Sequence, residues 1–130
     1  MSTTDEAGGT ITPDAGHPAA HVTAGAAAHV TVQTTVDSPE AAEKLASAAV
    51  EARLAACVQV SEVRSFYRWK GEVHQDPELL LSLKTSSSAV GALQDLLQEQ
   101  HPYEEPEIIV LPIIGGSRTY LDWVEENSRG

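Results

Sequence analysis

The sequence predicts an α+β sandwich in which two helices cover one face of a four-stranded antiparallel sheet, with one further helix at the C-terminus. Two observations lead to this fold class. Apolar residues switch between a period of two and a period near 3.6 along residues 29–113, in the order βαββαβ. Lys70 and Gly71 separate two runs of β-type composition, as expected for the turn of a hairpin. A chain of 130 residues has room for one such domain.

The first strand and the first helix are predicted on either side of Asp37. Val30, Val32, Thr34 and Val36 alternate with polar neighbours from residue 29, which is the period of a half-buried strand. Ser38 is a suitable N-cap and Pro39 suits the first position of a helix. The stripe expected to face the core comprises Leu45, Ala49 and Ala52.

The remaining elements are predicted from the same signals. Residues 55–69 and 72–85 form the two arms of the hairpin, and residues 86–100 form a second helix with serines for an N-cap. Residues 106–113 form a short apolar strand, and a short terminal helix follows the two glycines at 115 and 116. The second helix should pack through Val90, Leu93, Leu96 and Leu97, and the terminal helix through Tyr120, Leu121 and Val124.

The hairpin is too long for the sheet that it joins, since strands usually run to about 5–6 residues. Its tip should therefore project from the domain and carry Phe66, Tyr67 and Trp69 with it. A monomer would expose these rings beside an unpaired strand edge. We therefore expect a homo-oligomer.

Composition limits the other classes of protein. The chain has 8 basic and 19 acidic residues, a net charge of −11, so nucleic acid is not expected as a partner. The single cysteine, Cys57, excludes an internal disulfide, and no apolar run is long enough to cross a membrane. Residues 1–28 are mostly Ala, Gly, Ser, Thr and Pro, which predicts a disordered tail before a domain at 29–130. The expected location is the cytoplasm.

The segment from His101 to Pro112 combines two closely spaced prolines with a histidine, a tyrosine and three glutamates. Pro102 should end the second helix, and Pro106 can open the last strand, so the segment is a rigid corner. One interpretation is structural, with His101 capping the helix and Tyr103 packing. The other is a binding site, because a rigid corner holds its side chains in place.

Several of these segments together resemble the CutA family of divalent-cation tolerance proteins. They are "RLAACVQV", "SFYRWKGEV", "ELLLSLKT" and "HPYEEPEIIVLPI", and the resemblance covers residues 29–126. It implies a ferredoxin-like fold and a tight homotrimer similar to the PII signal-transduction proteins, with the hairpins paired between subunits. It also implies a link to copper tolerance and metal binding.

Two residues are candidate metal ligands. Cys57 offers a thiolate and His101 an imidazole, and both suit Cu(II) or another divalent cation. Copper-linked members that the chain resembles have a cysteine in the first strand and a histidine just before the "HPY" histidine, where this chain has Gln33 and Gln100. For Cys57, burial as a small apolar residue is the alternative interpretation.

A second candidate site is an inter-subunit cleft for a small polar ligand. Leu79, Leu81 and Leu83 share one face of their strand, so Glu78 and Lys84 share the other. The residues expected to line this cleft are Trp69, Glu78, Lys84, Tyr103 and Glu107. A network of surface or interface ion pairs is the alternative.

Three functions follow from these sites. The first is a homotrimeric divalent-cation tolerance protein that binds or responds to metal ions such as copper. The second is a PII-like trimer that binds a signalling or metabolic small molecule in the cleft. The third is an enzyme with Cys57 as nucleophile and His101 as base, and it ranks last because no recognisable oxyanion hole or phosphate-binding loop accompanies them. We therefore expect no enzyme activity and no organic cofactor.

Overall fold

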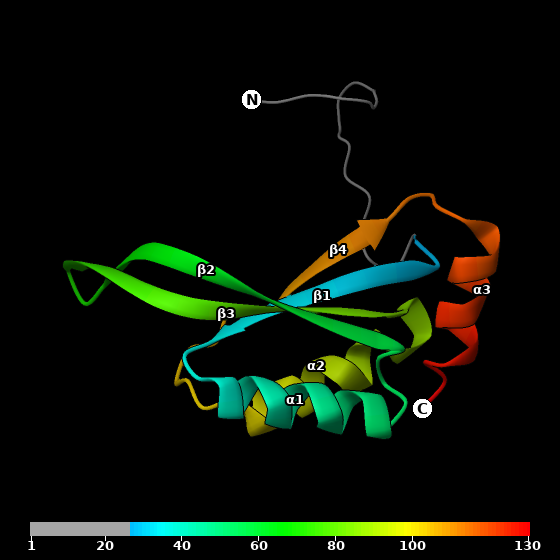
Figure 1. Ribbon diagram of the computed structural model, residues 1–130, viewed down its shortest axis with the longest axis horizontal. Helices are drawn as coiled ribbons and strands as arrows, with labels where there is room; N and C mark the ends of the chain where they lie inside the picture. Colours follow the sequence, from blue (N-terminus) through cyan, green and yellow to red (C-terminus); the bar gives the residue numbers. More distant parts are fainter. Residues whose placement is uncertain (1–26) are drawn as a thin grey trace.

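The computed structural model describes residues 27–130, so the tail predicted for residues 1–28 lies almost entirely outside the described residues. The observed order confirms the predicted βαββαβ arrangement with an added terminal helix (Figure 1). The elements are β1 (His29–Val36), α1 (Pro39–Glu51), β2 (Cys57–Trp69), β3 (Glu72–Ser86), α2 (Val90–Gln100), β4 (Ile109–Ile113) and α3 (Arg118–Glu126).

The four strands form one antiparallel sheet in the order β2-β3-β1-β4, and α1 and α2 lie side by side against one face of it (Figure 1). The alternation predicted for β1 is confirmed, because all four predicted inward side chains are buried. The core between sheet and helices is made of Val30, Val32, Val36, Ala42, Leu45, Ala49, Ala55, Leu81, Leu83, Leu93 and Leu97. Burying these aliphatic side chains is the main force that holds the two layers together.

The N-cap predicted from the sequence is observed for α1 but not for α2. Ser38 caps α1 as predicted, with its Oγ accepting a hydrogen bond from the Ala41 N–H at 3.1 Å. Because α1 ends at Glu51, Ala52 is exposed rather than in the buried stripe. The serine cap predicted for α2 is wrong. A 3₁₀ turn precedes α2 there, and Ala89 occupies its N-cap without a side-chain hydrogen bond.

The hairpin of β2 and β3 projects from the sheet, as predicted from its length. β1 pairs with β3 only as far as Leu79, so residues 63–78 have no third strand beside them. Lys70 and Gly71 form the two-residue turn with φ of 52° and 82°. Positive φ at both positions is the geometry that matches the twist of two paired strands.

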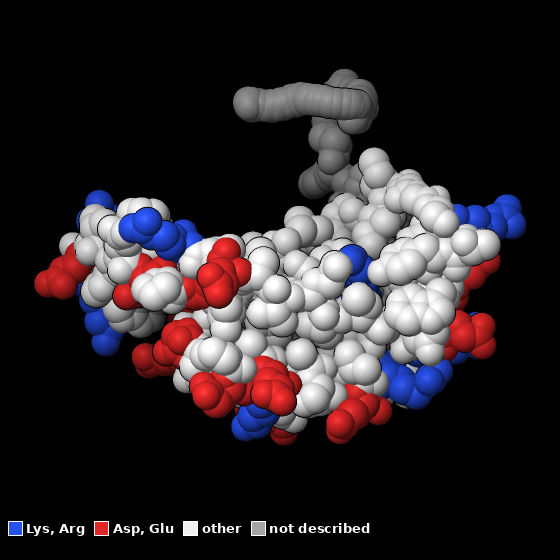
Figure 2. Space-filling view, in the orientation of Figure 1, with Lys and Arg blue, Asp and Glu red and all other residues white. Residues whose placement is uncertain are grey.

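The face of the sheet opposite α1 and α2 is left largely uncovered. Figure 2 shows a broad uncharged surface across the middle of the molecule, with charged side chains mainly around it. Ile109 and Leu111 of β4 lie on this face and are 44% and 40% exposed. An exposed apolar sheet face of this kind is typical of a surface that another subunit covers.

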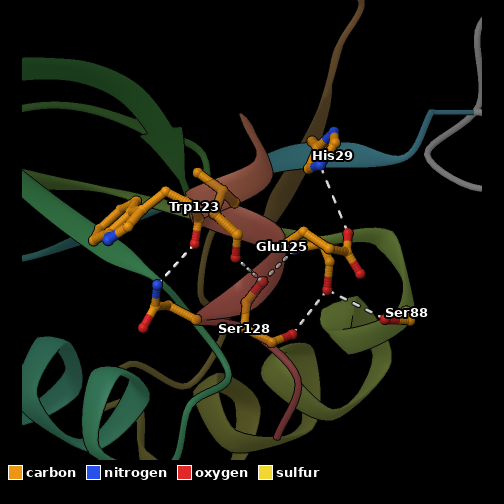
Figure 3. A network of polar contacts seen from close by, with 8 residues as sticks. His29, Ser88, Trp123, Glu125 and Ser128 are labelled. Carbon is orange, nitrogen blue, oxygen red and sulfur yellow. Dashed lines mark hydrogen bonds and ion pairs between the residues drawn. The ribbon is translucent and has the colours of Figure 1, made fainter. Parts of the chain in front are cut away.

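The terminal helix α3 packs at one end of the sheet, where polar contacts hold it (Figure 3). His29 Nε2 lies 3.6 Å from Glu125 Oε1, and Ser128 accepts two hydrogen bonds from Ser86 of β3. Val124 is fully buried as predicted, whereas Tyr120 is 41% exposed. Tyr120 therefore packs only at the edge of this contact, where it lies beside Cys57 of β2.

Candidate functional site: an acidic hollow at the base of the hairpin

A hollow of about 800 Å³ lies where the hairpin leaves the sheet. We call it the hairpin hollow. It is lined by Thr35, Asp37, Ser65, Phe66, Tyr67, Trp69, Asp76, Pro77, Glu78, Tyr103, Glu104, Glu105 and Glu107. Three parts of the chain therefore form its walls: the end of β1, the hairpin, and the rigid corner between α2 and β4.

The alternation of the hairpin strands places the key side chains on one face. Tyr67 and Trp69 of β2 point the same way as Asp76 and Glu78 of β3, since Tyr67 is paired with His74 and Trp69 with Glu72 in register. This face turns toward the corner that carries Tyr103. The strand period and the length of the hairpin therefore determine which side chains form this wall of the hollow.

The hairpin hollow is strongly acidic. Its six carboxylates are Asp37, Asp76, Glu78, Glu104, Glu105 and Glu107, and its lining contains no lysine, arginine or histidine. Figure 2 shows acidic side chains gathered where the hairpin meets the body of the molecule. A cleft with charge of one sign on low-dielectric walls concentrates ions of the opposite sign. The hollow is therefore suited to a cation.

Two tyrosines fix two of these carboxylates. The Tyr103 hydroxyl donates to Glu78 Oε2 at 2.6 Å, and the Tyr67 hydroxyl donates to Asp76 Oδ2 at 2.5 Å. Burial, together with the hydrogen bond to Glu78, raises the pKa of Tyr103 well above its ordinary value. The hydrogen bond to Asp76 raises the pKa of Tyr67. Both phenols therefore stay neutral and serve as donors that hold the carboxylates in position.

His101 forms the corner itself rather than a wall of the hollow. Its Nδ1 accepts a hydrogen bond from the Tyr103 N–H at 3.1 Å, so the proton of the neutral ring lies on Nε2. Nε2 lies 2.9 Å from the Thr35 carbonyl oxygen and 3.0 Å from Thr34 Oγ1. Burial lowers the pKa of His101, which favours this neutral ring. Both ring nitrogens therefore have partners outside α2, and the predicted capping of the helix is made by the His101 backbone N–H, which donates to the Leu97 carbonyl.

Cys57 and His101 are not brought together within a protomer. His101 contacts Thr34, which faces the helices, whereas Cys57 lies half-buried on the opposite face of the sheet. Thr34 of β1 pairs with Leu81 of β3, which pairs with Val60 of β2. Cys57 therefore lies two strands away from Thr34 across the sheet and three residues away along β2. These offsets amount to roughly 10 Å in each direction. A metal or thiol site that uses both residues is therefore not formed in one subunit.

Four of the five residues predicted to line an inter-subunit cleft lie together in one subunit. Trp69, Glu78, Tyr103 and Glu107 all line the hairpin hollow. Lys84 does not, because it lies further along β3, where its Nζ donates to Gln59 Oε1 on β2. Six residues of strand place Lys84 roughly 20 Å from Glu78 within one subunit, so its place in an inter-subunit cleft stays a prediction. The alternation of β3 could have identified Asp76, but no sequence signal marked Asp37.

The carboxylates of the hairpin hollow are spread around it rather than gathered at a point. Nowhere in residues 27–130 do three or more His, Cys, Asp or Glu side chains converge closely enough to hold one metal ion. The hollow of one subunit therefore offers a diffuse negative charge instead of a compact set of ligands.

None of the helices in residues 27–130 is both long enough and apolar enough to span a membrane.

Comparison with known proteins extends these observations. Residues 30–127 match the family of the CutA1 divalent ion tolerance protein. A divalent-cation tolerance protein CutA from Thermus thermophilus is 51% identical over 98 residues, which cover 75% of this chain and 95% of that protein. Protein CutA from Homo sapiens is 44% identical over 93 residues, which cover 71% of this chain but only 52% of the human protein.

Solved structures give the same result. The structure of a divalent cation tolerance protein from Thermus thermophilus superimposes with a TM-score of 0.74 at 48% identity, covering 77% of this chain and 98% of that one. The CutA protein of Archaeoglobus fulgidus, described as periplasmic, superimposes with a TM-score of 0.75 at 33% identity, covering 78% and 99%. The sequence matches and the structural superpositions point to the same family. The chain belongs to the CutA1 family of divalent ion tolerance proteins.

Proposed function

We propose that this divalent-cation tolerance protein works as a homotrimer that binds metal ions such as copper in the hairpin hollow, with a neighbouring subunit completing each site. The observation that carries the proposal is the set of six carboxylates around a hollow without a basic residue. Within one subunit these carboxylates do not form a complete site for a single ion. A second subunit would have to supply the missing ligands.

The exposed apolar surface supports the homotrimer. Phe66 and Val73 on the projecting hairpin are 66% and 69% exposed, and the uncovered sheet face adds Ile109 and Leu111. The outer strands β2 and β4 also offer unpaired backbone groups along the sheet edges. In a cyclic trimer a neighbouring subunit would cover these surfaces, and the same contact would occur at each of the three interfaces.

The donor chemistry supports divalent cations as the ligand. Carboxylate oxygens bind hard divalent ions, and for a given set of oxygen or nitrogen ligands the affinity among first-row divalent ions peaks at Cu(II). Cu(II) is therefore the most sensitive probe. The predicted ligands Cys57 and His101 are not needed, since they lie apart and the ring nitrogens of His101 already have partners.

Calorimetry with Cu(II), Zn(II) and Mn(II), combined with light scattering, tests the proposal. We expect a trimer that binds Cu(II) most tightly, and Glu78→Gln should weaken binding by about tenfold or more because a carboxylate is lost. Cys57→Ser and Asp122→Asn, which lies on α3 far from the hollow, should leave the affinity unchanged. Loss of Cu(II) binding in Cys57→Ser or His101→Gln, with Glu78→Gln unaffected, would move the site to those residues.

A small polar ligand in the same hollow is the second candidate, in the manner of a PII-like signalling or metabolite-binding trimer. The volume of about 800 Å³ and the aromatic walls favour it, because both are usual for small-molecule sites. The six carboxylates would repel anionic nucleotides. A panel of ATP, ADP and neutral nucleosides in the same calorimeter tests this, and tight ATP binding would contradict the charge argument.

The proposed role is that of a binding protein in the cytoplasm and not of an enzyme. The relatives are named as tolerance proteins, and the two residues of the hypothetical thiol mechanism do not meet within a protomer. Two relatives are named as chloroplastic and one as periplasmic, so the compartment needs its own measurement. Fractionation of cells that express the full chain, followed by immunoblotting, would give it.

A further inference from the structure

The uncovered face of the sheet carries one charge in an otherwise uncharged surface, and this charge indicates what covers the face. We propose that a second copy of this chain docks there and that the partner subunit's Glu107 pairs with Lys84. The inference rests on the proposed homotrimer. It deepens that proposal by naming the surface on which the neighbour docks and the ion pair that orients it.

Strand alternation places Lys84 in the middle of the uncovered face. Lys84 pairs with Cys57 on β2 and with Thr31 on β1, and Thr31 pairs with Leu111 on β4. These four residues form one row across the sheet, on the face opposite α1 and α2. Between the rows of His29 and Thr35, Lys84 is the only Asp, Glu, Lys or Arg that the described strands place on this face. Figure 2 shows the broad uncharged surface around it.

Lys84 has a neutral partner within its own subunit. Its Nζ donates to Gln59 Oε1 on β2, and no carboxylate of residues 27–130 forms a salt bridge with it. A neighbour that covers the face takes the Lys84 ammonium out of water. A buried charge without an opposite charge is strongly unfavourable. The covering surface must therefore bring a carboxylate to Lys84.

The chain itself carries a suitable carboxylate at the margin of the same face. Glu107 is exposed and lies two residues before Ile109, on the same side of an extended chain as Ile109 and Leu111. Two strands and four residues separate Glu107 from Lys84 within a subunit, a distance of roughly 16 Å. The Lys84 Nζ is also turned toward β2 and away from β4. The pair can therefore form only between subunits.

A second copy fits this face because the face is complementary to itself. In a cyclic assembly each subunit offers Lys84 to one neighbour and Glu107 to the other. Ile109 and Leu111 lie between the two charges and are 44% and 40% exposed, so the contact also buries apolar area. An ion pair within such a contact fixes the orientation of the partner. Glu107 stands at the rim of the hairpin hollow, which leaves its other carboxylates for a metal ion.

Charge reversal in the full chain tests the proposal, with sedimentation over a range of protein concentrations in enough urea to dissociate part of the wild type. Lys84→Glu should raise the concentration at which the assembly dissociates by about a hundredfold, because it places two carboxylates together at each interface. Lys84→Glu/Glu107→Lys should recover most of this loss, since the pair forms again with its signs exchanged. Lys44→Glu, at an exposed position of α1, makes the same change in net charge and should leave assembly unchanged.

A mismatched double variant separates the ion pair from net charge. Lys84→Glu/Glu126→Lys restores the charge on exposed α3 instead and should assemble as poorly as Lys84→Glu. If Lys84→Glu alone does not fold by circular dichroism, the comparison of the two double variants decides. Equal assembly of the two double variants, or a Lys84→Glu trimer as stable as the wild type, would overturn this inference and leave the homotrimer standing. A monomeric wild type would overturn both and assign the face to a different protein.

Discussion

At the scale of single residues, His101 shows how a side chain suited to metal binding can be used for structure instead. Its two ring nitrogens connect the corner after α2 to the end of β1 through Tyr103 and Thr35. Because Nδ1 must accept a hydrogen bond from the Tyr103 N–H, only the neutral ring fits this arrangement. The charge state of His101 therefore affects how firmly the hollow's wall is held.

The pH dependence of stability tests this role of His101. Burial lowers its pKa in the folded state below the ordinary value of 6.5, so the unfolded state binds the proton more readily. The contribution to stability is complete above 6.5 and is lost as the pH falls below 6.5 toward the folded pKa. We expect thermal melts from pH 7.5 to 5 to show a smaller loss of stability in His101→Gln than in the wild type. Parallel curves for the two proteins would contradict the assignment.

At the scale of elements, two glycines with equal space around them should respond to substitution in opposite ways. An added Cβ at Gly71 or at Gly91 would meet no heavy atom within 4 Å. They differ only in the backbone, since Gly71 has a φ of +82° in the hairpin turn while Gly91 lies in α2. Steric contact with neighbouring atoms therefore cannot explain a difference in stability between the two alanine variants.

The expected result follows from backbone conformation alone. Gly71→Ala should destabilise the protein by about 1–2 kcal/mol, because a side chain disfavours positive φ. Gly91→Ala should stabilise it by about 0.5–1 kcal/mol, because alanine favours a helix. Urea unfolding of both variants at matched protein concentration measures the difference. A loss of stability in Gly91→Ala would show that some contact outside the subunit limits α2.

At the scale of the whole molecule, the hairpin that forms one side of the hollow is also the part with least support from its own subunit. Residues 63–78 project beyond the third strand, and they carry Phe66, Tyr67 and Trp69. These rings are 66%, 42% and 40% exposed in the protomer. Assembly and ligand binding should therefore be linked, because a neighbour that covers the hairpin also closes the hollow.

The dependence of assembly on Trp69 tests this link. Trp69→Ala should weaken the trimer, since truncating a buried aromatic costs about 3–5 kcal/mol and the loss would occur at each of three interfaces. Val50→Ala, an exposed apolar position on α1, is the control and should leave assembly unchanged. Light scattering and thermal melts at matched concentrations give the measurement. A monomeric wild type, or a Trp69→Ala trimer of unchanged stability, would show that the hairpin has another role.

The sequence by itself determined the layers and order of this fold. Val30 and Val32 alternate along β1, Leu45 and Ala49 recur along α1, and each local period decides which face of its own element is apolar. The positive φ at Gly71 could likewise be expected from the turn that the flanking strands require. Such features depend on neighbours in the chain, so a single sequence contains them.

Only the tertiary structure decided which distant residues meet. The separation of Cys57 from His101, and the removal of Lys84 from the hollow, depend on strand register and on the face to which each strand turns. Asp37 joins Glu78 in the hollow because the end of β1 lies beside the base of the hairpin. Ser86 bonds to Ser128 instead of capping α2, since the docked C-terminus offers it better partners. Contacts between segments far apart in sequence leave no periodic pattern, so only the packed chain could show them.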